Sequence, residues 1–450
     1  MASYDGSDDG HNRRHLQILT MGAPAQDTIF ALSSGALPAG IGVVRVSGPQ
    51  AGAALQALAG RLPDARRAVT AVLHDDAGEM LDRALLLWLP GPATVTGEDI
   101  AEFHLHGGRA VVAAVLKALG AMEGLRMADP GEFTQRAFAN GRLDLAQAEG
   151  LADLLSAETE SQRRQALRLA EGGLGRLVSA WRDRLLSLAA RVEAALEFAE
   201  DEDDVPALEA GSLADLQRLA VEMAAALERP PAERLRDGVR IVVAGPPNAG
   251  KSSIINALSG REAAIASPIA GTTRDLIEVP LAIAGMPCLL IDSAGLRGTG
   301  GAVERIGVAR ARAAIESADL ILWLGPVTQC PDPTRAILIR TKADLGGKVQ
   351  GAVDVATSTV TGEGLETLRH LIEVRVRALL PPPDMIALNA RHRERIGEAR
   401  DEIAAASAQQ ELLLVAEHLR QARIALDRIT GRAGVEEMLD VLFGRFCIGK

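Results

Sequence analysis

A loop suited to binding phosphate stands near the middle of the chain, in the segment GPPNAGKSS at residues 245–253. The segment matches G-x-x-x-x-G-K-[ST] and follows an apolar run that predicts a strand. In such a loop, backbone N–H groups and a helix N-terminus surround an anionic phosphate, and glycine lets the chain approach closely. We expect Lys251 to contact the β- and γ-phosphates and the Ser252 hydroxyl to bind Mg²⁺. The other predicted contacts of the loop are Asn248, Ala249, Gly250 and Ser253.

Two later segments supply further parts of a nucleotide site in the expected order. Asp292 of DSAG ends an apolar run and is expected near the metal, with the Gly295 N–H near the γ-phosphate. Asp344 of TKAD can accept two hydrogen bonds from guanine, whose ring carries donors where adenine's does not. The pattern therefore predicts GTP rather than ATP as the ligand.

The predicted base contacts depart from the usual GTPase pattern at two places. Thr341 stands where the motif normally has asparagine, which predicts a somewhat lower affinity for guanine; Lys342 follows it. Ser358 and Thr359 occupy the place of the usual base-contacting Ser-Ala pair, and we include Ser358 in the predicted site.

The glutamine that usually assists GTP hydrolysis is missing from the sequence. Ras-like enzymes orient the attacking water with this residue directly after the glycine of DxxG, and this chain has Leu296 there. The segment SPIAGTTRD at 267–275 offers two replacements for the missing charge stabilisation. Its carbonyls, beside Asn248, can bind a monovalent cation against the phosphates, or Arg274 can supply the charge itself. Thr273 can reach Mg²⁺ in either case.

Composition limits the class of protein. The 450 residues are 48% apolar but only 2% aromatic, so the length predicts roughly three domains with aliphatic cores. A net charge of −11 argues against strong direct nucleic-acid binding, which usually needs a basic surface. Three scattered cysteines exclude a disulfide framework and favour a reducing compartment, so we expect a cytoplasmic location. No apolar run is long enough to predict a membrane span.

Apolar periodicity indicates how the chain is divided. Strand-like runs at 41–48 and 83–91 precede a helical stretch at 107–122. Spacings of three and four predict helices around 185–196, 211–229 and 412–429. Between the helices predicted at 211–229 and 412–429, short apolar runs alternate with helical segments, which predicts a parallel sheet covered by helices.

The predicted fold class is multidomain, α and α/β. We expect a disordered extension at 1–20 and an N-terminal α+β domain at 21–128. A helical domain is expected in two parts, at 129–236 and 381–450, with a Ras-like P-loop GTPase domain inserted at 237–380.

The chain ends in FCIGK, which makes Cys447 the fourth residue from the end. A prenylation box is excluded, because it needs an aliphatic residue before a terminal Ser, Met, Gln, Ala, Leu or Phe, and the chain has Gly449 and Lys450 there. Two interpretations remain at this point: a frayed tail with an idle thiol, or a tail held in a site where the thiol and the lysine act.

Several blocks of the sequence together resemble the tRNA-modification GTPases of the MnmE/TrmE family. In the predicted GTPase domain the resemblance rests on 245–275 and on DSAGLRGTGGAVERIGVARAR at 292–312. Before it, DTIFALSSGALPAGIGVVRVSG at 27–48, GPATVTGEDIAEFHLHGG at 91–108 and PGEFTQRAFANGRLDLAQAEG at 130–150 resemble the family's N-terminal blocks, and FCIGK resembles its C-terminal signature. The resemblance covers nearly everything from Met21 onward.

This resemblance implies metal-binding and catalytic residues. Glu304 corresponds to the glutamate that helps to arrange the attacking water when two GTPase domains meet. The implied K⁺ ligands are Asn248 and the backbone of Ser267, Ile269 and Thr272, and the implied Mg²⁺ ligands are Ser252 and Thr273.

The resemblance also implies a site for a tetrahydrofolate one-carbon donor, as the 5,10-methylene or 5-formyl derivative. The matching residues are Arg45, Glu102, Arg142 and Lys450. Arg142 replaces a lysine that the family commonly has, which keeps the charge but changes its geometry. The family's tail reaches the folate site, and its cysteine, here Cys447, is needed for modification.

The implied function is that of a GTP-hydrolysing homodimer acting on the wobble uridine, position 34, of certain tRNAs. An FAD-dependent partner of the MnmG/GidA family would form a heterotetramer with it, with FAD in the partner alone, and the two would add an aminomethyl or carboxymethylaminomethyl group at C5. The rival hypothesis is a regulatory GTP switch, which would not need Arg45, Glu102, Cys447 or Lys450. A stand-alone folate-dependent transferase leaves the GTP site unexplained.

Overall fold

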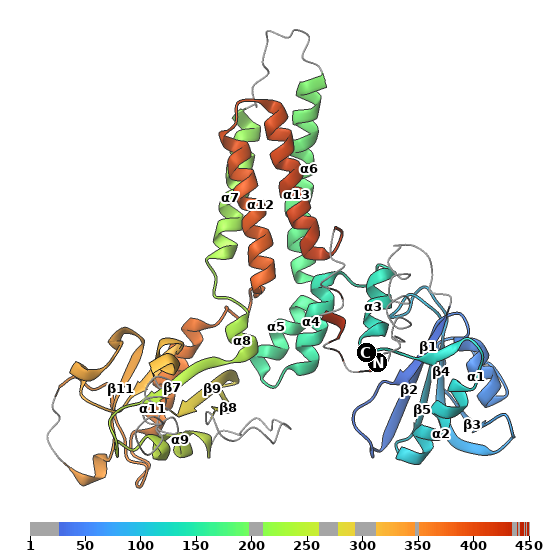
Figure 1. The fold of residues 1–450 in the computed structure, drawn as a ribbon, viewed down its shortest axis with the longest axis horizontal. Coiled ribbons are helices and arrows are strands. Elements are labelled where there is room, and N and C mark those ends of the chain that lie inside the picture. The colour runs from blue at the N-terminus through green and yellow to red at the C-terminus, as the bar shows by residue number, and fades with distance from the viewer. Residues whose placement is uncertain are drawn as a thin grey trace, which may run out of the picture. The chain divides into compact units, whose positions relative to one another are not determined.

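The computed structural model describes residues 27–197, 210–260, 278–292, 312–346 and 351–433, with 439, 442–444, 446, 448 and 449. The chain forms two units, each with its own helices and strands (Figure 1). The N-terminal unit takes in Met1–Ala152 and Thr430–Lys450, and the central unit takes in Asp153–Ile429.

The N-terminal unit is built on a six-stranded sheet with the order β3-β4-β5-β2-β1-β6. Its strands are β1 (Thr28–Leu32), β2 (Ile41–Ser47), β3 (Val69–His74), β4 (Met80–Leu89), β5 (Ile100–His106) and β6 (Leu125–Met127). β1 and β6 are parallel, and the other neighbouring pairs are antiparallel. The strands predicted near 41–48 and 83–91 are confirmed.

Helices cover both faces of this sheet. α1 (Ala51–Ala59) and α2 (Arg109–Gly120) share one apolar core with the face that carries Phe30 and Phe103. α3 (Glu132–Ala139) packs on the other face, where Phe133 joins Ile29 and Ala31. The alternation of Ile29, Phe30 and Ala31 between two cores follows from the two-residue period of a strand.

The last residues of the chain belong to the N-terminal unit. Leu439, Leu442, Phe443 and Phe446 form one buried cluster with Leu145 and Ala148 of α4 (Leu145–Ser156). The tilted rings of Phe443 and Phe446 lie 6.3 Å apart, centroid to centroid. Apolar burial thus holds the C-terminal segment to a helix that lies some three hundred residues earlier in the sequence.

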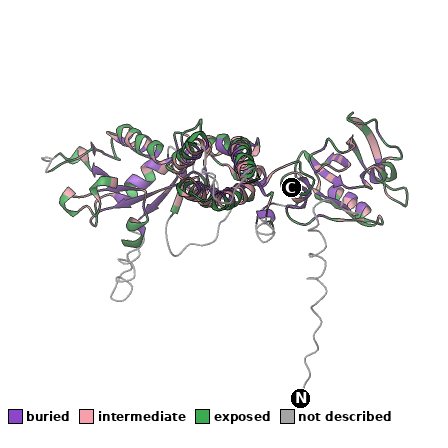
Figure 2. Cartoon of the chain, turned by 90° about the horizontal axis from the view of Figure 1, so that it is seen from above, coloured by how far each residue is buried: buried purple, intermediate pink, exposed green. Residues whose placement is uncertain are grey.

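The central unit contains four long helices that run side by side in Figure 1: α6 (Gly173–Glu197), α7 (Ala210–Leu227), α12 (Ala390–Ala408) and α13 (Leu412–Thr430). Their buried residues, coloured purple in Figure 2, face the middle of the bundle. Leu185, Leu188 and Val192 of α6 are all buried, which confirms the predicted apolar stripe. The shorter α5 (Glu160–Ala170) begins at a capping box formed by Thr159 and Gln162.

A second six-stranded sheet lies in the same unit, in the order β12-β11-β10-β7-β9-β8. Its strands are β7 (Val239–Ala244), β8 (Glu278–Ile283), β9 (Met286–Asp292), β10 (Leu320–Trp323), β11 (Ala336–Arg340) and β12 (Val355–Ala356). α9 (Lys251–Ser259) and α11 (Leu365–Leu379) contribute to one core of the sheet, and α8 (Glu233–Asp237) leads into β7.

The prediction of a parallel sheet was wrong at one strand. β8 pairs with β9 in antiparallel fashion, because the two are joined by the tight turn at Ala284 and Gly285, both at positive φ. Two-residue turns of this kind connect antiparallel neighbours, whereas parallel strands need a crossover. The other pairs in the sheet are parallel. The fold class is confirmed, and the exact domain boundaries stay predictions.

No helix in the described part of the chain is long and apolar enough to cross a membrane.

Candidate functional site

The phosphate loop lies between the end of β7 and the start of α9, as its motif requires. Gly245 has a φ of +151°, and a side chain there would come within 2.8 Å of the Leu324 carbonyl oxygen, so glycine is required. Gly250, in the left-handed region at φ +91°, is the N-cap residue of α9. The loop therefore wraps around a helix N-terminus, whose backbone N–H groups favour an anion.

Lys251 is held inside this loop. Its side chain is buried, and its Nζ donates to the carbonyl oxygens of Gly245 at 3.1 Å and Pro246 at 2.9 Å. A cation held in such a loop can bind an anionic phosphate, and the contact of Lys251 with the phosphates stays a prediction.

The two described residues expected near the metal do lie together. The Ser252 hydroxyl, at the start of α9, is 3.5 Å from Oδ2 of Asp292, and that aspartate is buried at the end of β9. Oxygen donors of this kind suit Mg²⁺, which usually keeps several waters and takes its remaining ligands from phosphate and one or two protein groups. No group of three or more His, Cys, Asp or Glu suited to a metal occurs among the described residues.

The expected base-binding residues follow β11 and are tied to the phosphate loop. The Thr341 hydroxyl donates to the Ala249 carbonyl at 2.7 Å, and Lys342 Nζ donates to the Asn248 carbonyl at 3.1 Å. Asp344 is exposed within the short 3₁₀ turn Ala343–Leu345. These bonds fix the distance between the part of the site expected to hold phosphate and the part expected to hold the base.

Ser358 is fully buried and shapes the neighbouring loop. Its Oγ accepts hydrogen bonds from the Val360 and Thr361 N–H groups, both at 3.2 Å. Its side chain therefore organises the loop, and Thr359, the next residue, is exposed.

Several predicted site residues lie outside the described residues. In the GTPase domain these are Ser267, Ile269, Thr272, Thr273, Gly295 and Glu304, and at the tail they are Cys447 and Lys450. Both replacements considered for the missing glutamine, the 267–275 carbonyls and Arg274, fall there too.

A polar pair lies on the sheet of the N-terminal unit, where folate-binding residues were expected. Arg45 of β2 and Glu102 of β5 are register partners, and their side chains form an ion pair at 2.9 Å. The two side chains are only 23% and 15% exposed. His104 Nε2 lies 3.3 Å from the second oxygen of Glu102, and the Arg45 guanidinium lies 5.9 Å from the centre of the Phe133 ring.

Arg142 takes a different partner from this pair. Its Nε donates to the Thr94 carbonyl at 3.1 Å, and its stem lies beside Gly97. The structure thus brings Arg45 and Glu102 together and ties Arg142 to the loop that precedes β5.

The described tail residues are attached to the same sheet. Ile448 forms a β-bridge with Pro130, and the Gly449 carbonyl accepts a hydrogen bond from the Ser33 hydroxyl at 2.8 Å. Gly449 has a φ of +97°, and a side chain on it would collide with the Leu32 carbonyl, so glycine is required at this position as well. Residues 448 and 449 are therefore held by specific contacts rather than frayed.

Two family models together match most of the chain. A model of the TrmE N-terminus, described as that of a GTP-binding protein, matches residues 28–142, and a model of the MnmE helical domain matches residues 145–447. A tRNA modification GTPase MnmE from Erythrobacter litoralis is 56% identical over 426 residues, covering 94% of this chain and all of that protein. The chain belongs to the MnmE family. The MnmE protein of Rhizorhabdus wittichii is 57% identical and covers 95% of this chain and 98% of its own length.

A solved structure was also matched to this MnmE-family chain. The G domain of the T. maritima FeoB iron transporter is 30% identical, and the match covers 30% of this chain and 98% of that one, with a TM-score of 0.22.

A buried ion network near the polar pair was not anticipated from the sequence. Arg136 and Glu132 of α3 are both buried and pair at 2.9 Å, and Arg136 also bonds Asp27 at 2.9 Å and Glu98 at 3.2 Å. Arg126 of β6 joins the network through both Asp27 and Glu132. Charged residues of both signs at 126–136 were the available signal, but the sequence did not show that their side chains converge.

The network favours the ionised forms of Glu132 and Asp27. Burial alone would raise the pKa of Glu132, but hydrogen bonds from Arg126 and the Asp129 N–H, with the charge of Arg136, outweigh it and lower that pKa. The pKa of Asp27 is lowered in the same way, with burial opposed by Arg126 and Arg136. The network thereby anchors α3, whose Phe133 lies beside Arg45.

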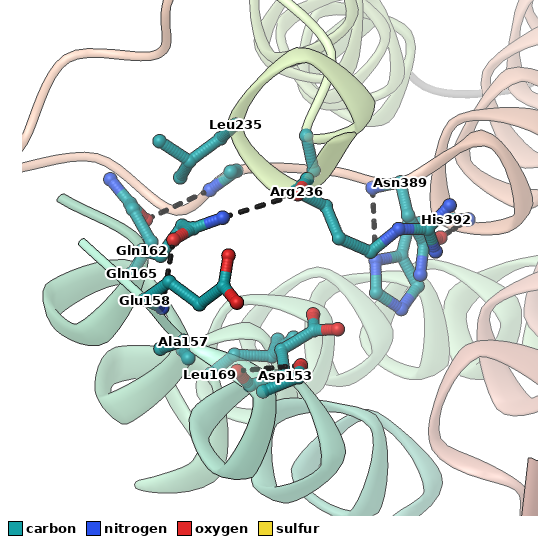
Figure 3. A pocket seen from close by; sticks show the side chains of 14 residues that line it. Asp153, Ala157, Glu158, Gln162, Gln165, Leu169, Leu235, Arg236, Asn389 and His392 are labelled. Atoms are coloured by element: carbon teal, nitrogen blue, oxygen red, sulfur yellow. Dashed lines mark hydrogen bonds between the residues drawn. The ribbon is translucent and has the colours of Figure 1, made fainter. Parts of the chain in front are cut away.

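A cavity of about 230 Å³ lies between α5, α8 and the start of α12 (Figure 3). Gln162 of α5 donates to the Arg236 carbonyl at 3.1 Å, just before the chain enters β7. Gln165 donates to the Pro382 and Met385 carbonyls at 3.0 and 2.7 Å, just after the chain leaves α11. α5 is thus bonded to the chain segment that precedes β7 and to the segment that follows α11.

Proposed function

We propose that this chain is a GTP-hydrolysing enzyme of tRNA modification that acts on the wobble uridine, position 34. With an FAD-dependent MnmG/GidA-type partner, it adds an aminomethyl or carboxymethylaminomethyl group to C5, and a tetrahydrofolate derivative supplies the carbon. Family membership, with a relative that aligns with 94% of this chain, supports the coarse activity. The attachment of Ile448 and Gly449 beside the sheet that carries Arg45 and Glu102 supports the finer proposal, because a GTP switch has no need for it.

In the GTPase step, the described residues bind and position the nucleotide. The loop backbone and Lys251 face the phosphates, Ser252 and Asp292 lie where Mg²⁺ would be held, and Asp344 accepts from the guanine ring. Mg²⁺ would neutralise charge that develops on the phosphates. Because Leu296 has no polar group, we assign the orientation of water to Glu304 and the additional positive charge to a K⁺ held by Asn248, Ser267, Ile269 and Thr272. Association of two GTPase domains in the homodimer would complete this arrangement.

The polar pair in the N-terminal unit fits a folate. Glu102 offers acceptor oxygens to an N–H-rich pterin edge, Arg45 offers donors to a carboxylate, and Phe133 supplies an apolar ring beside them. The group, when bound, would supply a one-carbon unit at the oxidation level of formaldehyde or formate. Arg142 and Lys450 would add positive charge for the anionic part of the cofactor.

The net negative charge of the chain is relevant to how tRNA is bound. A net charge of −11 disfavours a long-range attraction to the phosphates of tRNA. We therefore assign much of the tRNA contact to the partner protein. If the chain alone bound tRNA as tightly as the complex with the partner, this division of labour would be wrong.

The first test is nucleoside mass spectrometry of total tRNA from a strain that lacks the gene. We expect the 5-substituted wobble uridines to disappear and to return when the intact gene is restored. A chain truncated before Cys447 should keep GTP hydrolysis but should not restore these nucleosides. Ser33→Ala with Gly449→Ala tests the docking alone, since both changes leave Cys447 and Lys450 in place.

The rival GTP switch predicts another outcome. If the truncated chain restores the modified nucleosides as well as the intact chain does, the tail has no part in the chemistry. If the nucleosides never depend on the gene, the chain is a GTPase with a different output.

A further inference from the structure

The base-binding end of the nucleotide site differs from the usual pattern in its hydrogen-bonding capacity. Thr341 follows β11 directly, and its side chain is directed at the phosphate loop. Both its hydroxyl and its methyl group lie 3.6 Å from the position that a Cβ on Gly250 would occupy. The side chain is therefore packed against the loop and held there by the 2.7 Å bond to the Ala249 carbonyl.

That bond uses the only proton that the Thr341 side chain can offer. A hydroxyl has one O–H, and a backbone carbonyl can only accept, so the Thr341 hydroxyl must be the donor. An asparagine side chain carries two N–H donors, so it can bond the loop and still present a second donor. The Thr341 side chain preserves the first function and has no donor left for the second.

Guanine presents two acceptors and two kinds of donor along its edge. N1–H and the 2-amino group are donors, and they match the exposed carboxylate of Asp344. O6 and N7 are acceptors and need donors from the protein. In the described part of the chain, the Thr359 N–H is not engaged in a hydrogen bond and lies on the exposed loop that Ser358 shapes, which makes it a donor for O6. The Thr341 side chain has no such donor for N7, because its hydroxyl proton is bonded to the Ala249 carbonyl.

We infer that this chain recognises guanine through O6, N1 and the 2-amino group and makes no hydrogen bond to N7. Thr341 is a positioning residue that ties the base-binding segment to the phosphate loop. GTP and GDP are consequently bound more weakly, and released faster, than in the same site with asparagine. The inference rests on the GTP binding of the proposed function and is independent of the folate and tRNA chemistry.

The test compares GTP with 7-deaza-GTP, in which a C–H group replaces N7, on the full-length chain by equilibrium titration. The unmodified chain should bind the two nucleotides with affinities within about twofold of each other. Thr341→Asn should bind GTP roughly three- to tenfold more tightly than the unmodified chain, the size of one neutral hydrogen bond, and should gain nothing for 7-deaza-GTP. Thr341→Val, which loses the bond to Ala249, should weaken binding of both nucleotides by the same factor.

Each contrary result has a distinct meaning. A loss of threefold or more for 7-deaza-GTP in the unmodified chain shows an N7 contact and overturns the inference, and this measurement needs no variant that must fold. An equal gain of Thr341→Asn for both nucleotides also overturns it, because the gain then comes from loop order. If neither nucleotide binds to the unmodified chain, the GTPase assignment itself fails.

Discussion

The nucleotide site and the polar site of the N-terminal unit are built in opposite ways. The first depends on short continuous segments, since the loop, its lysine and its serine all fall within 245–253. The second is assembled from distant segments: Arg45 and Glu102 meet through strand register, and Ser33 bonds Gly449 across 416 positions of sequence. One site is specified by local backbone chemistry and the other by tertiary packing.

This difference determines how each site tolerates change. A phosphate loop is rigid because glycine conformations and backbone hydrogen bonds fix it. A side-chain substitution there should therefore remove a function without changing the fold. The polar site depends on the ion network that anchors α3, in which Arg136 and Glu132 are buried and Asp27 is partly exposed, so substitutions there act through stability. Substitutions in the two sites should therefore separate activity from stability.

Lys251→Ala gives the largest expected effect. Loss of the ammonium group that faces the phosphates should lower kcat/KM for GTP about 1,000-fold, in line with the loss of one catalytic electrostatic donor. The melting temperature should change by no more than a few degrees, because the Gly245 and Pro246 carbonyls that accept from Lys251 belong to the phosphate loop. Lys117→Ala in α2 of the N-terminal unit is the matched control. A large drop in melting temperature would show that the loop is not independent of the fold.

Asp344→Asn should change the base that the site prefers. The amide loses the charge and one acceptor, so GTP affinity should fall about 100-fold, the size of two charge-assisted hydrogen bonds partly lost. Xanthosine triphosphate has a carbonyl in place of the 2-amino group, and it should bind the variant better than GTP does. Competition titrations measure both affinities, with Glu363→Gln on the neighbouring loop as the control. Equal loss for both nucleotides would place Asp344 outside the base contact.

Sequence patterns could predict the nucleotide site far better than the polar site of the N-terminal unit. The loop at 245–253 and the strands around it are local, and the structure has Lys251 bonded within the loop and the Ser252 hydroxyl 3.5 Å from Asp292. The family resemblance, rather than periodicity, indicated Arg45 and Glu102, because strand register depends on partners that a single sequence does not name. The antiparallel β8 was missed for a related reason: its tight turn at Ala284 and Gly285 carries little signal beside the surrounding apolar runs.

Glu132→Gln should destabilise the N-terminal unit by about 3 kcal/mol, because it leaves two arginines short of a buried negative partner. The three tryptophans permit a local measurement. Trp88 lies in β4, whereas Trp181 and Trp323 lie in the central unit, so a chain with both of the latter changed to Phe reports only the N-terminal unit. Urea unfolding followed by Trp88 fluorescence then gives the difference, with the exposed Glu79→Gln as the control. A change below 0.5 kcal/mol, the usual scatter of surface substitutions, would contradict a structural role.

Glu132 should also make the stability of the N-terminal unit sensitive to acid. The pKa of Glu132 is lowered in the folded chain from its ordinary value of 4.5, so the folded state binds its proton less readily than the unfolded state does. The stability that Glu132 contributes is therefore complete above its ordinary pKa and is lost as the pH falls from there through the lowered pKa. Between pH 7 and pH 4, the unmodified N-terminal unit should lose more stability than Glu132→Gln does. Parallel losses in the two proteins would assign the acid sensitivity to other carboxylates.

Ser33→Ala gives the smallest effect and tests the tail contact most directly. It removes one partly buried hydrogen bond to the Gly449 carbonyl, worth about 1 kcal/mol, so the undocked population of the tail should rise about fivefold. Hydrogen exchange of the C-terminal peptide measures that population. Ser34→Ala is the matched control, because Ser34 bonds the Val43 N–H at 3.1 Å and not the tail. If Ser34→Ala speeds exchange as much as Ser33→Ala, the sheet edge as a whole holds the tail. If only Ser33→Ala does, a single side chain sets how often the functional end of the chain leaves its site, which no local sequence pattern would have shown.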